Sequence, residues 1–362
     1  MLNALVNGTN ELGFKIRHKL RPYYKKPLFI SITKFYFRHV LGLLRKFYPL
    51  YGITAVVSLT YRCQCSCVHC GAGLYRKNKE EELKPEEIFK LMDDISALGA
   101  AGIHFFGGEP LLVAELARYV RHAKAKRLLA SVDTNGLALD EKKALELKEA
   151  GIDIIRVSID SPSPEEHDRL RGVPGVFEKG IEGLKFCKKH GINCAMSLVA
   201  TAANLGNGDL EKLISLAGSL GLRVRILASI ATGKWLEKEN TALDKAGIAK
   251  LRSLLNENVY WETEFLNSAE IPFWCNSMIR NKFDISAYGE IQACCYMPIT
   301  YGNIRKEPIA AILKKMWASE LFESRREHFD CPLNDPSFRS TYDKLLKSEI
   351  DKQSSAASSC RK

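Results

Sequence analysis

This sequence lacks several features that define whole classes of protein. No apolar stretch runs long enough without charged residues to cross a membrane, which takes about 20 apolar residues in a helix. Residues 1–26 contain no apolar core ahead of their charges, so a secretory signal peptide is not expected. Acidic residues are nearly absent from residues 1–52, where Glu11 stands alone. These absences predict a cytoplasmic protein with an unusual amino-terminal segment.

Cysteine, in contrast, is plentiful, with 11 among 362 residues. Without a signal peptide, this content argues against a disulfide framework and for a reducing compartment. Cys63, Cys67 and Cys70 have the spacing C-x3-C-x2-C and follow an apolar run that reads as a buried strand. Cysteine thiolates hold iron–sulfur clusters, and three of them leave one iron of a cubane open. A zinc loop is the alternative, although zinc sites normally use two cysteine pairs or a Cys/His set.

After this loop, apolar strands alternate with amphipathic helices, a pattern typical of parallel βα units. The resulting prediction is an α/β fold with too few strands to close an eight-stranded barrel. The expected strands are 53–59, 102–106, 128–133, 153–159, 193–200 and 222–228, and the expected helices are 85–98, 111–126, 141–150, 176–190 and 209–220.

The cysteine loop and the turn Gly107-Gly108-Glu109-Pro110 at the second strand end together resemble the radical S-adenosylmethionine (radical SAM) superfamily. The resemblance implies a partial (β/α)6 TIM-like barrel and a [4Fe–4S] cluster whose open iron binds S-adenosylmethionine. One electron then cleaves this cofactor to a 5′-deoxyadenosyl radical, which abstracts hydrogen from substrate. His69 stands where the family usually has an aromatic residue, and Cys65 is expected to be a spectator.

The same resemblance implies contacts to S-adenosylmethionine. Gly107 and Gly108 would permit close backbone approach, Pro110 would fix the exit of the turn, and Glu109 would neutralise the cofactor ammonium.

Further cofactor contacts are expected at the ends of later strands. Asn135 lies in a turn after the third strand, although Asn-Gly is also simply a good turn. Ser158 and Asp160, at the end of the fourth strand, would face the ribose and carboxylate. Arg171 would bind an anion, or else is a solvated helix arginine. No catalytic acid or base is assigned.

A second cysteine set lies after residue 270. Cys275, Cys294 and Cys331, with a glycine before the second of them, resemble the SPASM and twitch domains that carry auxiliary clusters. The later C-x2-C-x5-C-x3-C run of a full SPASM domain is missing, so one auxiliary [4Fe–4S] cluster is expected. Its fourth ligand is left open between Cys295, Cys360, another group and substrate. A zinc site or plain buried thiols are the alternatives.

The amino-terminal segment carries ten of the 53 Lys and Arg residues. Residues 28–48 read as a basic, aromatic amphipathic helix, which suits an anionic membrane surface. Packing on the barrel or on a second subunit is the alternative, and nucleic-acid binding is not expected because of the apolar content. This segment predicts peripheral contact with the inner face of the membrane.

These patterns divide the chain into a basic appendage (1–52), a partial barrel (53–235), a helical connector (236–269), a small α+β auxiliary-cluster domain (270–335) and a polar tail (336–362). The expected activity is radical hydrogen abstraction from an unidentified small-molecule, lipid or peptide substrate, with a lipid or membrane-delivered molecule as a candidate because of the basic segment. The alternatives are a peptide-modifying maturase acting on a peptide substrate and, from another class, a non-catalytic metal-binding scaffold. The resemblance also implies an electron donor of the flavodoxin or ferredoxin type. The substrate itself is not encoded in these motifs.

Overall fold

The computed structural model of the chain describes residues 50, 52–72, 80–230, 243–261, 275–323, 331–335, 337, 338, 340 and 342. The predicted amphipathic helix at 28–48 and Cys360 lie outside the described residues. Within them, no helix is both long and apolar enough to cross a membrane.

A single sheet with the strand order β10-β9-β8-β1-β2-β3-β4-β5-β6-β7 organises the described residues. Neighbouring strands run parallel from β1 to β7, and β8 is parallel to β1. Strand β9 pairs antiparallel with β8 on one side and with β10 on the other. The strands are β1 (Thr54–Thr60), β2 (Gly102–Gly107), β3 (Leu129–Thr134), β4 (Ile154–Ser158), β5 (Cys194–Ala200), β6 (Arg223–Ala228), β7 (Val259–Trp261), β8 (Lys282–Ile285), β9 (Glu290–Cys294) and β10 (Met297–Asn303).

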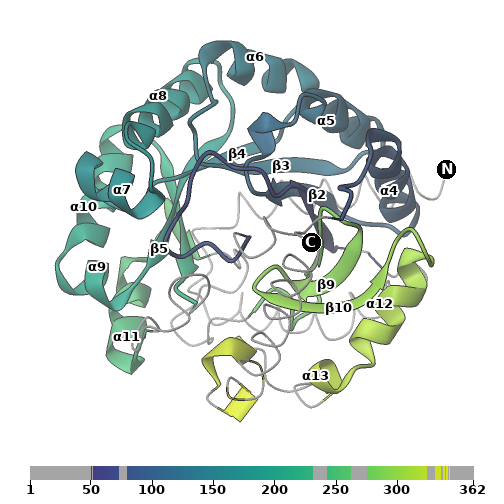
Figure 1. The fold of residues 1–362 in the computed structure, drawn as a ribbon. Coiled ribbons are helices and arrows are strands. Elements are labelled where there is room, and N and C mark those ends of the chain that lie inside the picture. Colours follow the sequence, from purple (N-terminus) through teal and green to yellow (C-terminus); the bar gives the residue numbers. More distant parts are fainter. Residues whose placement is uncertain are drawn as a thin grey trace, which may run out of the picture.

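Helices follow the strands and form an arc around the outside of the sheet (Figure 1). They are α4 (Pro85–Ala97), η4 (Pro110–Leu112), α5 (Leu116–Ala125), α6 (Glu141–Ala150), α7 (Pro164–Arg171), α8 (Val176–Lys189), α9 (Ala202–Gly206), α10 (Asp209–Ser219), α11 (Lys245–Leu254), α12 (Ile309–Trp317), α13 (Glu320–Glu323) and η6 (Pro332–Asn334). Because α12 packs on β9 and β10, it extends this outer layer beyond the barrel strands.

The two faces of the sheet differ in chemistry. Fully buried apolar residues such as Val57, Phe105 and Val132 alternate along the strands and belong to the main hydrophobic core. The intervening positions of β2 to β6 are largely polar. In register, His104 lies beside Ser131, and Asp133 beside Arg156. Alternation along a strand therefore sends apolar side chains towards the helices and polar ones to the inner face.

The partial barrel predicted from the sequence is confirmed, and each of its six expected strands exists within about two residues of the expected bounds. Two features were not expected. Strand β7 lies within the segment interpreted as a helical connector and extends the sheet beyond β6. The carboxy-terminal hairpin joins the same sheet, because β8 pairs with β1 through contacts such as Val57 beside Ile285.

Candidate functional site

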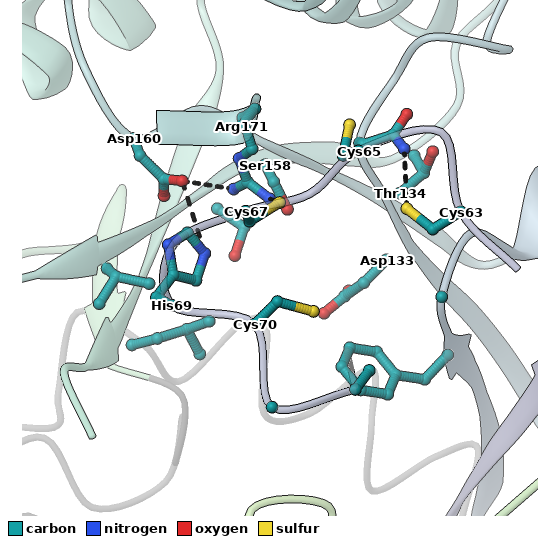
Figure 2. Close-up of a pocket in the computed structure, with 18 of the residues that line it drawn as sticks. Cys63, Cys65, Cys67, His69, Cys70, Asp133, Thr134, Ser158, Asp160 and Arg171 are labelled. Carbon is teal, nitrogen blue, oxygen red and sulfur yellow. Dashed lines mark hydrogen bonds and ion pairs between the residues drawn. The ribbon is translucent and has the colours of Figure 1, made fainter. Parts of the chain in front are cut away.

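One cavity lies at the carboxyl ends of the strands, where βα folds position their chemistry. Cys63, Cys67 and Cys70 all line it, together with residues that lie on β2 to β6 or shortly after β2, β3 and β4 (Figure 2). The three sulfur atoms are not arranged as ligands of one metal ion. No other group of three or more His, Cys, Asp or Glu side chains in the described part of the chain is arranged in this way either. The three cysteines predicted from their spacing therefore line the same cavity.

The cysteine loop is fastened to the end of α7. The Ser66 N–H donates to the carbonyl of Arg171 at 2.9 Å, and the Val68 N–H donates to the carbonyl of Leu170 at 3.1 Å. Gly172 ends α7 with φ of +71°, and a Cβ there would lie 2.3 Å from Ser66 Oγ. A residue with a side chain would be strained at this φ and would force the Ser66 hydroxyl to move.

The glycine turn packs against the base of this loop. Gly107 has φ of +122°, and a Cβ on it would lie 2.4 Å from the carbonyl oxygen of Thr60. A Cβ on Gly108 would lie 2.3 Å from the carbonyl oxygen of Arg62. Both glycines line the cavity. The close approach that requires glycine is thus made, within this chain, to the backbone that leads into Cys63.

Glu109 is placed differently from the expectation that its carboxylate meets a cofactor ammonium. The side chain is fully buried and is not among the groups lining the cavity. It accepts hydrogen bonds from the Leu111 N–H (3.0 Å), the Thr134 hydroxyl (2.7 Å) and the Asn135 N–H (2.8 Å). Burial raises the pKa of Glu109 to about 7 despite these donors. Glu109 therefore joins the glycine turn to the end of β3 behind the cavity wall. Pro110, the first residue of η4, is buried as well and is not among the groups lining the cavity.

Asn135 extends this connection to the cysteine loop. Its side-chain amide donates to Cys63 Sγ at 3.7 Å and to Gln64 Oε1 at 3.2 Å. The side chain lines the cavity. A chain of contacts thus runs from the buried Glu109 through Asn135 to the first cysteine of the motif.

A buried charged group occupies the opposite wall. Arg171 Nη2 lies 2.6 Å from Asp160 Oδ2, and His69 Nε2 lies 3.8 Å from the same oxygen (Figure 2). Burial alone would raise the pKa of Asp160, but Arg171 and then His69 hold it below its ordinary value. Arg171 is only 8% exposed, so its interpretation as a solvated helix arginine is wrong.

Cys67 and Ser158 complete this wall. A hydrogen bond with Cys65 and the charge of Arg171 lower the pKa of Cys67 to about 5, although burial opposes them. A thiolate, the form that binds metals, is therefore favoured at Cys67. Ser158 ends β4 beside Ser197 of β5, and both line the cavity.

The sequence interpretation did not select Asp133, Arg225 or His104, which meet on the inner face of the sheet. Arg225 pairs with Asp133, and His104 Nε2 lies 3.4 Å from the same carboxylate. The sequence does contain a signal for a polar site, because His104 interrupts the apolar run of β2 and Arg225 that of β6. Nothing in the sequence, however, showed that these positions face one another.

The second cysteine set is linked by pairwise contacts, although it is not arranged as a metal-ligand group. Cys275 and Cys331 share a hydrogen bond, which lowers the pKa of Cys275 to about 7 against the effect of burial. The same hydrogen bond and then burial raise the pKa of Cys331, and the nearby Cys294 raises it further. Cys295 is hydrogen-bonded to Cys294 and also lines the cavity that contains Cys63. The predicted auxiliary cysteines thus lie together beside the main site.

Comparisons with known proteins match both regions. The family model described as the radical SAM superfamily matches residues 57–215, and one described as an iron–sulfur cluster-binding domain matches residues 275–345. An AdoMet-dependent heme synthase of Oleidesulfovibrio alaskensis is 28% identical over 75% of this chain and 76% of its own length. A PqqA peptide cyclase of Granulibacter bethesdensis is 29% identical over 52% of this chain and 49% of its own length.

Solved structures show the same fold at low identity. Streptococcus suis SuiB bound to the precursor peptide SuiA has a TM-score of 0.60 at 16% identity, covering 79% of this chain and 69% of that chain. The enzyme anSMEcpe with bound AdoMet has a TM-score of 0.56 at 17% identity, covering 75% of this chain and 82% of that chain.

Proposed function

Because this chain belongs to the radical SAM superfamily and carries an iron–sulfur cluster-binding domain, we propose that it cleaves S-adenosylmethionine reductively and abstracts hydrogen from an organic substrate. The superfamily and the domain imply a [4Fe–4S] cluster with S-adenosylmethionine and an auxiliary iron–sulfur cluster. When bound, these groups supply the electron and the carbon radical, chemistry that belongs to the cofactor rather than the protein.

The residues present fit the first cluster. Cys63, Cys67 and Cys70 offer thiols to one cavity, and thiolates are the ligands that such clusters take. Cys67 already has a lowered pKa, and Asn135 directs an amide donor at the sulfur of Cys63. Hydrogen bonds to sulfur of this kind orient cluster ligands and tune a cluster.

One observation carries the proposal: the cysteine motif and most of the predicted S-adenosylmethionine contacts line the same cavity. Besides the cysteines, these are Gly107, Gly108, Asn135, Ser158, Asp160 and Arg171. Residues from five separate segments of the chain meet there, and a purely structural metal site would need only its ligands. This gathering favours an enzyme over a non-catalytic scaffold.

Within this cavity the residues have distinct roles. The backbone of Gly107 and Gly108 lines the cavity beside the cluster loop and offers peptide groups to a small zwitterion bound there. Asp160 and Arg171 offer a carboxylate and a guanidinium to the ammonium and carboxylate of S-adenosylmethionine. Glu109 acts from behind by holding Asn135, so we assign it a positioning role in place of direct cofactor contact.

The auxiliary cluster would be held by Cys275, Cys294 and Cys331. Cys295 is the better candidate for a fourth ligand within the described residues, because its thiol reaches both Cys294 and the main cavity. A cluster in this place would adjoin the radical site and could carry an electron to or from a substrate.

For the substrate, a tetrapyrrole is the first candidate and a peptide the second. Relatives named AdoMet-dependent heme synthase match over about three quarters of the chain, whereas the relative named PqqA peptide cyclase matches over 52% of it. The sequence itself had pointed to a lipid because of residues 28–48. That segment lies outside the described residues, so contact with a membrane stays a prediction.

Anaerobic reconstitution followed by reduction with dithionite in the presence of S-adenosylmethionine tests the activity. We expect about eight irons per chain and formation of 5′-deoxyadenosine. A protein that binds iron but never forms 5′-deoxyadenosine, with either a porphyrin or a peptide present, would contradict the proposal.

A further inference from the structure

A second cavity adjoins the cofactor pocket on the inner face of the sheet. The two cavities share six lining residues, namely Phe106, Asp133, Arg225, Leu227, Cys295 and Tyr296. The second cavity continues towards the starts of the strands, where Thr54, His104 and Arg156 line it. None of Cys63, Cys67 and Cys70 lines it. It is therefore a chamber next to the cluster site that cluster-bound S-adenosylmethionine does not need.

This chamber is polar where a closed barrel would be filled by branched apolar side chains. At its centre, Arg225 donates to Asp133 Oδ2 and, at 2.8 and 3.1 Å, to the hydroxyl of Ser197. Arg156 Nη1 lies 3.5 Å from the other carboxylate oxygen of Asp133. His104 contacts the same carboxylate and places Nδ1 2.8 Å from Ser131 Oγ. Five adjacent strands thus contribute to one buried polar group.

The charges that line the chamber do not cancel. Among the lining residues that the structure describes, Arg156, Arg225 and Lys282 are cationic, whereas Asp133 and Asp284 carry carboxylates. Burial lowers the pKa of His104, so at neutral pH this ring adds no charge. Apart from Cys295, which is proposed as a cluster ligand, the described lining residues therefore carry one positive charge in excess, and in a buried setting such an excess attracts an anionic group.

We propose that this chamber is a carboxylate-binding subsite, in which the guanidinium groups of Arg225 and Arg156 bind a carboxylate of the substrate. Guanidinium forks bind carboxylates through paired, charge-assisted hydrogen bonds, and one excess positive charge matches one carboxylate better than a phosphate dianion. Because the chamber adjoins the pocket of Cys63, Cys67 and Cys70, a carboxylate held there would place neighbouring carbon atoms towards the site of hydrogen abstraction. This subsite rests on the proposed function and names the chemistry of its substrate.

A carboxylate could come from a porphyrin side chain or from a peptide, and the test separates these sources. The reconstituted protein with S-adenosylmethionine is titrated with coproporphyrin III and with its methyl ester, followed by porphyrin fluorescence. In parallel, the blocked peptides acetyl-Gly-Glu-Gly-amide and acetyl-Gly-Gln-Gly-amide, which have no terminal charges, are titrated by calorimetry. Each acid and its uncharged analogue form a matched pair that differs in the carboxylate charge.

The variant Arg225→Gln removes the central guanidinium, and Arg225→Lys keeps the charge without the fork. The matched control is Arg223→Gln, on the same strand, where Arg223 contacts Asn193 and lies over the Tyr260 ring without lining either cavity. Iron content and circular dichroism verify folding. If Arg225→Gln fails this test, Arg156→Gln takes its place.

At least one acid should bind to the unaltered protein and to Arg223→Gln, with affinity lower by about tenfold or more in Arg225→Gln. Its uncharged analogue should bind the unaltered protein more weakly by a similar factor. Equal binding of acid and analogue, undiminished binding to Arg225→Gln, or no saturable binding of either acid would each overturn the subsite. If the unaltered protein forms 5′-deoxyadenosine but binds neither acid, the subsite is wrong and the proposed function stands. If an acid binds but no 5′-deoxyadenosine forms, the proposed function is wrong instead.

Discussion

Arg171 donates a hydrogen bond from Nη1 to the sulfur of Cys67, 3.6 Å away, although 104 positions separate them in the sequence. The same guanidinium forms a buried ion pair with Asp160 at 2.6 Å. This pair fixes the orientation of the guanidinium, so the positive charge stays beside a predicted cluster ligand. The end of α7 thereby acts on the cluster site through its side chain as well as through its backbone.

Replacing Arg171 should change the cluster electronically. Reduction adds negative charge to a cluster, and a donor beside a ligand sulfur stabilises that charge. We expect Arg171→Gln to lower the reduction potential by an amount on the order of tens of millivolts, measured by redox titration followed by electron paramagnetic resonance without S-adenosylmethionine. Arg169→Gln is the control, because Arg169 lies on the same helix but is paired with Glu166 at the surface. An equal potential in both variants would contradict this role.

The cysteine motif should account for one cluster. Replacing Cys63, Cys67 and Cys70 by Ala removes every thiol of the spacing motif, so about four irons and all formation of 5′-deoxyadenosine should be lost. Iron analysis and chromatography of the products measure both. Cys65→Ala should keep its iron, because Cys65 is expected to be a spectator. Loss of iron in Cys65→Ala would show instead that this buried cysteine supports the loop.

The auxiliary cysteines should account for the remaining iron. Cys275→Ala combined with Cys331→Ala should lose about four irons while the spectrum of the first cluster is retained. Cys295→Ala and Cys360→Ala then test the two cysteine candidates for the fourth ligand, because replacing a true ligand should alter the auxiliary signal in Mössbauer or paramagnetic resonance spectra. An unchanged signal in both variants would leave another group or substrate as the fourth ligand. An unchanged iron count in the double variant would mean that these thiols are simply buried.

Stability should depend on pH through Glu109. Its pKa is raised from an ordinary value of 4.5 to about 7 by burial, so the stabilisation is complete below the ordinary value and is lost as pH rises through about 7. The free energy of unfolding should fall by about 3 kcal/mol over this range. Glu109→Gln cannot ionise and should lack this fall. It should be less stable at low pH, because its amide would face the N–H of Asn135.

Thermal unfolding of the reconstituted proteins across this pH range measures the effect. The gap in unfolding midpoint between the unaltered protein and Glu109→Gln should narrow as pH rises. A constant gap would mean that Glu109 does not titrate in this range.

The basic segment should decide attachment to membranes. Deletion of residues 1–49 removes ten basic residues and one acid. Each Lys or Arg near an anionic surface contributes about 1 kcal/mol to the free energy of membrane binding. In flotation assays, the full chain should bind vesicles containing phosphatidylserine and the deletion variant should not, with iron content equal in both. Equal flotation of the two proteins would remove the membrane interpretation.

Local patterns in the sequence determined the class of the protein. The cysteine motif lies within eight residues, the glycine turn is contiguous, and the alternation of strands and helices has a short period. Each of these signals arises from neighbouring residues, so none requires knowledge of how distant segments pack. The partial barrel, the cluster loop and the end of β2 beside it could therefore be read directly.

The tertiary structure decided the roles that depend on distant partners. Glu109 was expected to face the cofactor, but the approach of β3 turns it inwards to Thr134 and Asn135. Arg225 meets Asp133 only because β3 and β6 curve around one inner face. Strand order and register set such meetings, and they follow from the packing of the whole sheet rather than from any single segment.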